Sequence, residues 1–136
     1  MSFCVMKNSL KMSKKILILA TILLALAVSV GAFGSHGLKN ILLETGKTEV
    51  FETAVRYHFY HSFGLLFIGI MLQKNSHRFL HYASYLFVIG ILIFCGSLYT
   101  LSLTGFTKLG MLAPIGGLSF ILGWLLCAYA IYKTED

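Results

Sequence analysis

Charge is scarce in this sequence. Asp, Glu, Lys and Arg make up 12% of the 136 residues, whereas 57% of the residues are hydrophobic. Soluble domains carry about 25% charged residues and a smaller apolar share, so this composition is unlike theirs. Proline occurs only once, and acidic residues number five. The shortage of charge indicates a chain that lies in a membrane.

Cysteine is also rare, and its pattern excludes two kinds of site. The three cysteines, Cys4, Cys95 and Cys127, are odd in number and include no Cys-x-x-Cys pair. A disulfide framework or a cysteine-based metal site therefore has no basis in the sequence. We expect Cys95 and Cys127, which lie in apolar runs, to pack as small hydrophobic side chains.

Four apolar runs carry no charged side chain: 16–33, 62–72, 82–103 and 114–132. An uncharged run of about 18 residues is typical of a membrane-spanning helix. Three runs are long enough alone, and the second is long enough once its polar lead-in is counted. The sequence predicts an all-α integral membrane protein. Its fold would be a four-helix bundle with spans near 16–34, 49–72, 78–103 and 113–132.

The segments outside the spans also allow structural predictions. We expect residues 1–15, which are polar and basic, to be a disordered leader, and residues 16–136 to form a single four-span transmembrane domain. The segment GLKNILLE (37–44) places its apolar residues on one face. This pattern favours a short helix lying in the membrane interface between the first two spans. Gly46 is its expected C-cap, and Pro114 is expected in the first turn of the last span.

The net charge of +6 does not indicate a nucleic-acid-binding protein, because the chain has no basic stripe with interleaved aromatic residues. The basic residues instead flank the apolar runs, as an orientation signal does. With the N-terminus inside, seven lysines and arginines lie in inner segments and four in outer ones. We therefore expect both termini in the cytoplasm, with membrane lipids around the spans. The sequence does not decide whether the protein has a membrane-protein partner or forms a homo-oligomer.

Small residues recur at every fourth position in several runs. This spacing lets helix backbones approach closely in lipid, so it supports a tightly packed bundle. The rows are Thr21/Ala25/Ser29, Ala27/Gly31/Ser35, Gly96/Thr100/Thr104 and Ser119/Gly123/Cys127.

The stretch FETAVRYHFYH (51–61) gathers charged, phenol and imidazole side chains at the head of an apolar run. On a helix, Glu52, Arg56 and Tyr60 form one ridge, and Tyr57 and His61 form another. Glu52 and Arg56 are spaced to form an ion pair. The other ridge would point toward the end of the first span. The candidate polar cluster comprises His36, Glu52, Arg56, Tyr57, Tyr60 and His61.

Several interpretations of this cluster stay open. It can be a hydrogen-bonded network that locks helix ends, in a non-catalytic structural or accessory protein. It can be a polar pocket at the outer membrane face, in a transporter or small-molecule-binding protein. It can also be a haem or metal site of a redox protein, with His36, His58 and His61 as weak candidate ligands. The sequence contains no nucleophile elbow, phosphate loop or paired-carboxylate motif that would indicate an enzyme, and we expect no cofactor.

Four motifs occur in order along the chain: GAFGSHGLK (31–39), FETAVRYHFYH (51–61), CGSLYTLSLTG (95–105) and LAPIGGLSFILGW (112–124). Together they resemble the small four-helix membrane proteins of the YgdD/YwdK type, a bacterial family of unknown function. The resemblance implies a multi-pass protein of the bacterial inner membrane with no established biochemical role. The family's polar motif falls on His36, Glu52, Arg56, Tyr57 and His61. Members commonly carry glutamine at the position of His58, which weakens any mechanism that needs a pair of histidines there.

Overall fold

A computed structural model describes residues 3–133, with side chains described from Leu10 onward. All regular secondary structure in this part of the chain is helical, which confirms the all-α class. The elements are α1 (Phe3–His36), α2 (Lys39–Thr45), α3 (Thr48–Lys74), α4 (Arg78–Gly90), the π-helical η1 (Ile91–Cys95), α5 (Gly96–Thr104), the 3-10 helix η2 (Thr107–Leu112) and α6 (Ala113–Tyr132).

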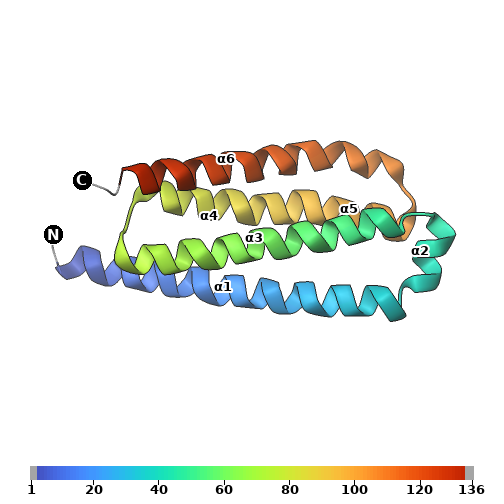
Figure 1. Cartoon of the computed structure of the whole chain (residues 1–136), viewed down its shortest axis with the longest axis horizontal. Coiled ribbons are helices and arrows are strands. Elements are labelled where there is room, and N and C mark those ends of the chain that lie inside the picture. The colour runs from blue at the N-terminus through green and yellow to red at the C-terminus, as the bar shows by residue number, and fades with distance from the viewer. Residues whose placement is uncertain (1–2, 134–136) are drawn as a thin grey trace.

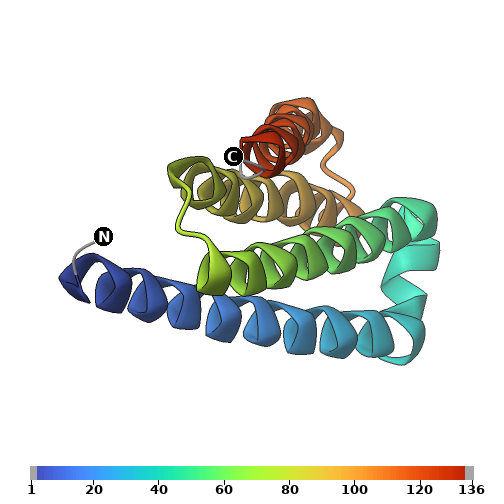
Figure 2. The ribbon, with the colours of Figure 1, turned by 60° about the vertical axis from the view of Figure 1, so that its left-hand side comes forward.

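The long helices lie side by side along the length of the molecule (Figures 1 and 2). Helix α3 lies in the middle, with α1 against one side and the continuous segment α4–η1–α5 against the other. Helix α6 packs on α4 and η1, while α1 packs mainly on α3. Both termini lie at one end, and α2 and η2 lie at the opposite end (Figure 1). The side of α1 that faces away from α3 is therefore left uncovered.

The first helix is longer than expected. It begins at Phe3, so residues 3–15, which we expected to be a disordered leader, continue the first span as a helix. One reason is a polar contact near its start: the fully buried Ser13 hydroxyl donates to the Gly69 carbonyl of α3 at 3.0 Å. The first two residues of the expected leader lie outside the described part of the chain.

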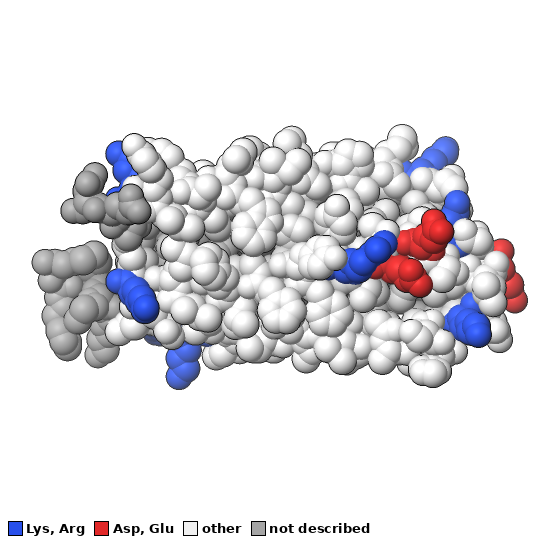
Figure 3. All heavy atoms as spheres, viewed as in Figure 1, with Lys and Arg blue, Asp and Glu red and all other residues white. Residues whose placement is uncertain are grey.

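Within residues 3–133, three helical segments are long and apolar enough to cross a membrane: Leu10–His36, Arg78–Thr104 and Thr107–Tyr132. Helix α3 is not among them, because polar residues occupy its first turns, although it is 27 residues long and runs alongside the others. Figure 3 shows an uncharged band around the middle of the molecule, with charged side chains at its two ends. Such a surface suits the lipid environment of a membrane protein.

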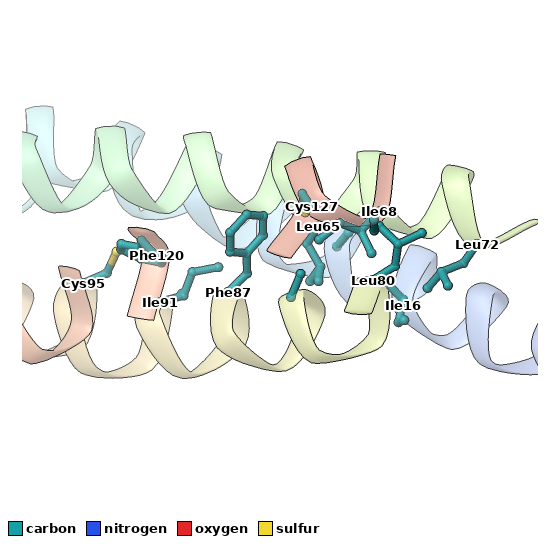
Figure 4. Packing of buried hydrophobic residues seen from close by; sticks show 13 residues of the cluster. Ile16, Leu65, Ile68, Leu72, Leu80, Phe87, Ile91, Cys95, Phe120 and Cys127 are labelled. Atoms are coloured by element: carbon teal, nitrogen blue, oxygen red, sulfur yellow. The ribbon is translucent and has the colours of Figure 1, made fainter. Parts of the chain in front are cut away.

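The contact between α4 and α6 depends on small residues. Gly123 lies against α4, Cys127 is buried, and the Ser119 hydroxyl donates to the Leu86 carbonyl of α4 at 2.8 Å. This buried row confirms the packing expected from its four-residue spacing. A Cβ atom at Gly123, or at Gly64 of α3, would lie 2.6 Å from the Phe87 ring, so these glycines make room for that ring. Figure 4 shows the ring pointing from α4 toward α3 within the buried core.

Of the other rows of small residues, one lies at a helix contact and two do not. Ala27 is fully buried and Gly31 lies against Val55, so their row faces α3. The rows that begin at Thr21 and Gly96 do not lie at helix contacts. Their hydroxyl groups bond to carbonyls of their own helix, and no atom lies within 4 Å of a Cβ placed on Gly96.

Local signals at helix ends agree with the structure. Gly46 adopts a left-handed conformation with φ of 64° and ends α2, as expected for a C-cap. Gly105 ends α5 in the same way, with φ of 71°. Pro114 lies in the first turn of α6, where its missing amide proton costs no hydrogen bond.

Candidate functional site

The polar start of α3 does not form one site. Because successive residues turn by about 100° around a helix, its side chains divide among three neighbouring surfaces. One set faces a groove beside α1 and α2, a second packs against η1 and α6, and a third meets α5. Each set therefore has its own chemistry.

The first set lies in a partly open groove of about 460 Å³ between the end of α1, α2 and the start of α3. Leu42, Leu43, Phe51 and Val55 supply much of its apolar wall, and Gly31 and Gly34 form the α1 side without side-chain bulk. Its polar lining consists of Ser35, Lys39, Thr48, Glu52 and Arg56. The groove is thus an apolar surface edged by charges of both signs.

The prediction of an ion pair between Glu52 and Arg56 is wrong. Within residues 3–133 no salt bridge joins them, and the Arg56 guanidinium instead donates to the Thr53 hydroxyl at 3.2 Å. Both charged side chains are exposed, where an ion pair gains little over separate hydration. Their charged groups therefore remain available to a ligand in the groove.

The second set packs in an aromatic stack instead of lining a pocket. The His61 ring lies 3.4 Å from the Phe120 ring, centroid to centroid, and the two planes are 11° from parallel. Tyr57 packs on Phe94 of η1 with centroids 4.6 Å apart. The His61 Nδ1 bonds to the Tyr57 carbonyl at 2.9 Å, which requires the proton on Nδ1. We expected this ridge to face the end of α1; it faces η1 and α6 because α1 packs on another side of α3.

The third set is centred on His58, which is 5% exposed. Its Nδ1 lies 3.2 Å from the Tyr99 hydroxyl of α5. Its Nε2 and the buried Ser62 hydroxyl, one turn along α3, have no hydrogen-bond partner among the described residues. Sequence reasoning missed Tyr99 as a partner, although a tyrosine within an apolar run was a signal that could have identified it.

The remaining candidates lie apart from these sets. His36 ends α1 and is exposed, and Tyr60 is 57% exposed on α3. The three histidines proposed as metal ligands are not brought together, and the described residues contain no group of three or more potential ligand side chains. Lys39, which edges the groove, was not among the candidates. Its place opposite α3 depends on how α2 folds back, which no local pattern specifies.

Comparisons with known proteins place these features in a family. Residues 30–117 match the family described as "Protein of unknown function (DUF423)". This range includes the residues that line the groove, and the residues of α3 and η1 that belong to the aromatic stack. The chain is 40% identical over 120 residues to a UPF0382 membrane protein of Staphylococcus haemolyticus, covering 88% of this chain and 97% of the relative.

Two further relatives come from other bacterial genera. The UPF0382 membrane protein YwdK of Bacillus subtilis is 39% identical over 121 residues, covering 88% of this chain and 98% of the relative. A UPF0382 membrane protein of Haemophilus influenzae is 34% identical over 126 residues, covering 92% and 99%. No solved structure matches the chain. The similarity spans nearly the whole of each relative, and the chain therefore belongs to this DUF423 (UPF0382) family of bacterial membrane proteins, whose function is unknown.

Proposed function

We propose that the protein is a non-catalytic four-span protein of the bacterial inner membrane that binds a small amphiphilic molecule in the groove between α1, α2 and α3. In this arrangement α3 is the second span. Its length of 27 residues corresponds to about 40 Å, which exceeds the hydrocarbon thickness of a membrane. Its polar first turns then lie at headgroup level, beside the interfacial helix α2.

The charge distribution supports an orientation with both termini in the cytoplasm. Basic side chains described at the end with the termini are Lys11, Lys14, Lys15, Lys74, Arg78 and Lys133, and no described acidic side chain lies there. The opposite end carries Lys39, Lys47, Arg56 and Lys108 together with Glu44, Glu49 and Glu52. An excess of lysine and arginine is typical of cytoplasmic segments.

The observation that carries the binding function is the combination of groove wall and edge. A wall of leucine, phenylalanine and valine side chains suits an apolar portion of a ligand, and the charged edge suits a polar portion. The volume of about 460 Å³ is within the range of small-molecule sites, about 300–1,000 Å³. The aromatic stack fills the neighbouring level of the protein, so the groove is the better candidate for a pocket than the stack.

Photocrosslinking tests this function. The probe is diacylglycerol with a photoreactive group near its glycerol end, presented to the protein in vesicles. We expect crosslinked peptides from the end of α1 and the start of α3. Ser35→Trp, which adds a bulky side chain to the groove, should abolish these crosslinks, whereas Asn40→Trp on the exposed side of α2 should not. Crosslinks spread evenly around the protein in both variants would refute the proposal.

An accessory role with a protein partner or a second copy is a second candidate. The observation in its favour is that the row Thr21/Ala25/Ser29 of α1 is exposed, although small residues at this spacing often mark helix contacts. Ala25→Trp would block such a contact. Light scattering of the purified protein should then show a lower oligomeric state than for the unmodified chain, and an unchanged state would exclude self-association through this row.

A further inference from the structure

We propose that the groove selects a zwitterionic phospholipid headgroup, with Arg56 and Lys39 binding the phosphate and Glu52 binding an ammonium group. This inference rests on the proposed binding function and identifies the class of ligand. The three side chains come from two elements that face each other across the groove: Lys39 begins α2, and the other two lie one turn apart on α3.

The two cations supply the phosphate-binding chemistry. A guanidinium group has five N–H donors, and the only hydrogen bond described for Arg56 uses Nη2 toward Thr53. Its other donors can therefore make a bidentate contact with phosphate oxygens. Lys39 adds a second positive charge from the facing wall, and its flexible side chain can adapt to the position of the phosphate.

The carboxylate determines which phosphates fit. Glu52 lies one helical turn before Arg56 and lines the same groove without pairing to it. A ligand with only negative charge would be repelled by this carboxylate. A headgroup that carries an ammonium group a few bonds from its phosphate complements all three charges. The arrangement therefore favours a phosphoethanolamine headgroup over a phosphoglycerol headgroup.

The apolar wall and the position of the groove favour a lipid over a soluble phosphate compound. Leu42, Leu43, Phe51 and Val55 provide contacts that a free phosphate ester would not use. The groove is partly open and lies at the end of the molecule where charged side chains meet the uncharged band (Figure 3). Its volume suits a headgroup, the glycerol and the first carbons of the acyl chains, with the remaining chain length lying in the membrane.

The test compares photoreactive phosphatidylethanolamine, phosphatidylglycerol and diacylglycerol with the same crosslinking group, in vesicles of otherwise constant composition. We expect phosphatidylethanolamine to label the groove most strongly. Arg56→Ala should weaken this labelling about tenfold, as expected for the loss of a charge-assisted contact. Glu52→Gln should reduce the preference for phosphatidylethanolamine over phosphatidylglycerol by about threefold. Lys47→Ala and Lys108→Ala, which remove charges at the same end outside the groove lining, should leave both values unchanged.

Several outcomes would overturn the inference. If diacylglycerol labels the groove as strongly as both phospholipids, the groove binds amphiphiles without recognising phosphate, and only the general binding function survives. If no probe labels the groove, the binding function itself fails. If free glycerophosphoethanolamine competes as well as the intact lipid, the ligand is a soluble phosphate ester. Thermal unfolding of each variant provides the folding control, because all four substituted side chains lie at the surface or only partly buried.

Discussion

The contact between Gly116 of α6 and Phe94 of η1 leaves no room for a side chain. A Cβ atom at Gly116 would lie 2.5 Å from the Phe94 amide nitrogen, 2.7 Å from its Cβ and 2.9 Å from its Cα. These atoms belong to the backbone or adjoin it, so no rotation of a flexible side chain can relieve the overlap. Gly116→Ala must therefore shift α6 away from η1, where Phe94 supports Tyr57.

The neighbouring residue provides a matched control. A Cβ atom at Gly117 would meet the Phe94 ring at 3.8 and 3.9 Å, which is ordinary van der Waals contact. Both substitutions gain the same helix propensity, about 1 kcal/mol. Overpacking typically costs about 1–3 kcal/mol, and it applies only to Gly116→Ala. We expect Gly116→Ala to be less stable than Gly117→Ala by about 1–3 kcal/mol.

Thermal unfolding in detergent, followed with a thiol-reactive fluorescent dye, measures this difference. Cys95 and Cys127 are buried and react only when the helices separate. Both variants are made in a Cys4→Ser background so that these two thiols give the signal. At about 2–8 °C per kcal/mol, the Tm of the Gly116 variant should be lower by several degrees. Equal Tm values for the two variants would refute the close approach of α6 to η1.

Other predictions test the remaining features. Phe120→Ala, which removes the ring stacked on His61, should lower the free energy of unfolding by about 3–5 kcal/mol. Tyr60→Ala, which removes an exposed side chain, should change it by less than about 0.5 kcal/mol. Equal effects of the two substitutions in a denaturation series would contradict the stack. Gly105→Ala should lower the free energy of unfolding by about 1–2 kcal/mol, because φ at this position is 71°, although the added methyl group has space. An unchanged Tm would show that α5 does not end in this conformation. A phosphatase fused to the C-terminus, which is active only outside the cytoplasm, should be inactive; activity would reverse the proposed orientation.

Much of the secondary structure could be predicted from local sequence. Helix bounds at 49–72, 78–103 and 113–132 agree with the structure to within two residues at each end, because uncharged runs and end signals such as Gly46 are local features. The start of the first helix could not be predicted in this way. Its polar turns remain helical beside α3, where the Ser13 hydroxyl finds the Gly69 carbonyl, a partner 56 residues away.

Composition and local patterns were therefore enough to predict an all-α membrane protein, the positions of its apolar helices and the residues that share a helix face. Which helix faces meet depends on how the helices pack together. Rows at Ser119 and Thr21 have the same spacing, yet one is buried against α4 and the other is exposed. The polar residues of α3 likewise form a groove, a stack and a buried pair because three different neighbours surround the helix. Periodicity specifies a direction around one helix axis, whereas the choice of neighbour depends on the packing of all the helices together.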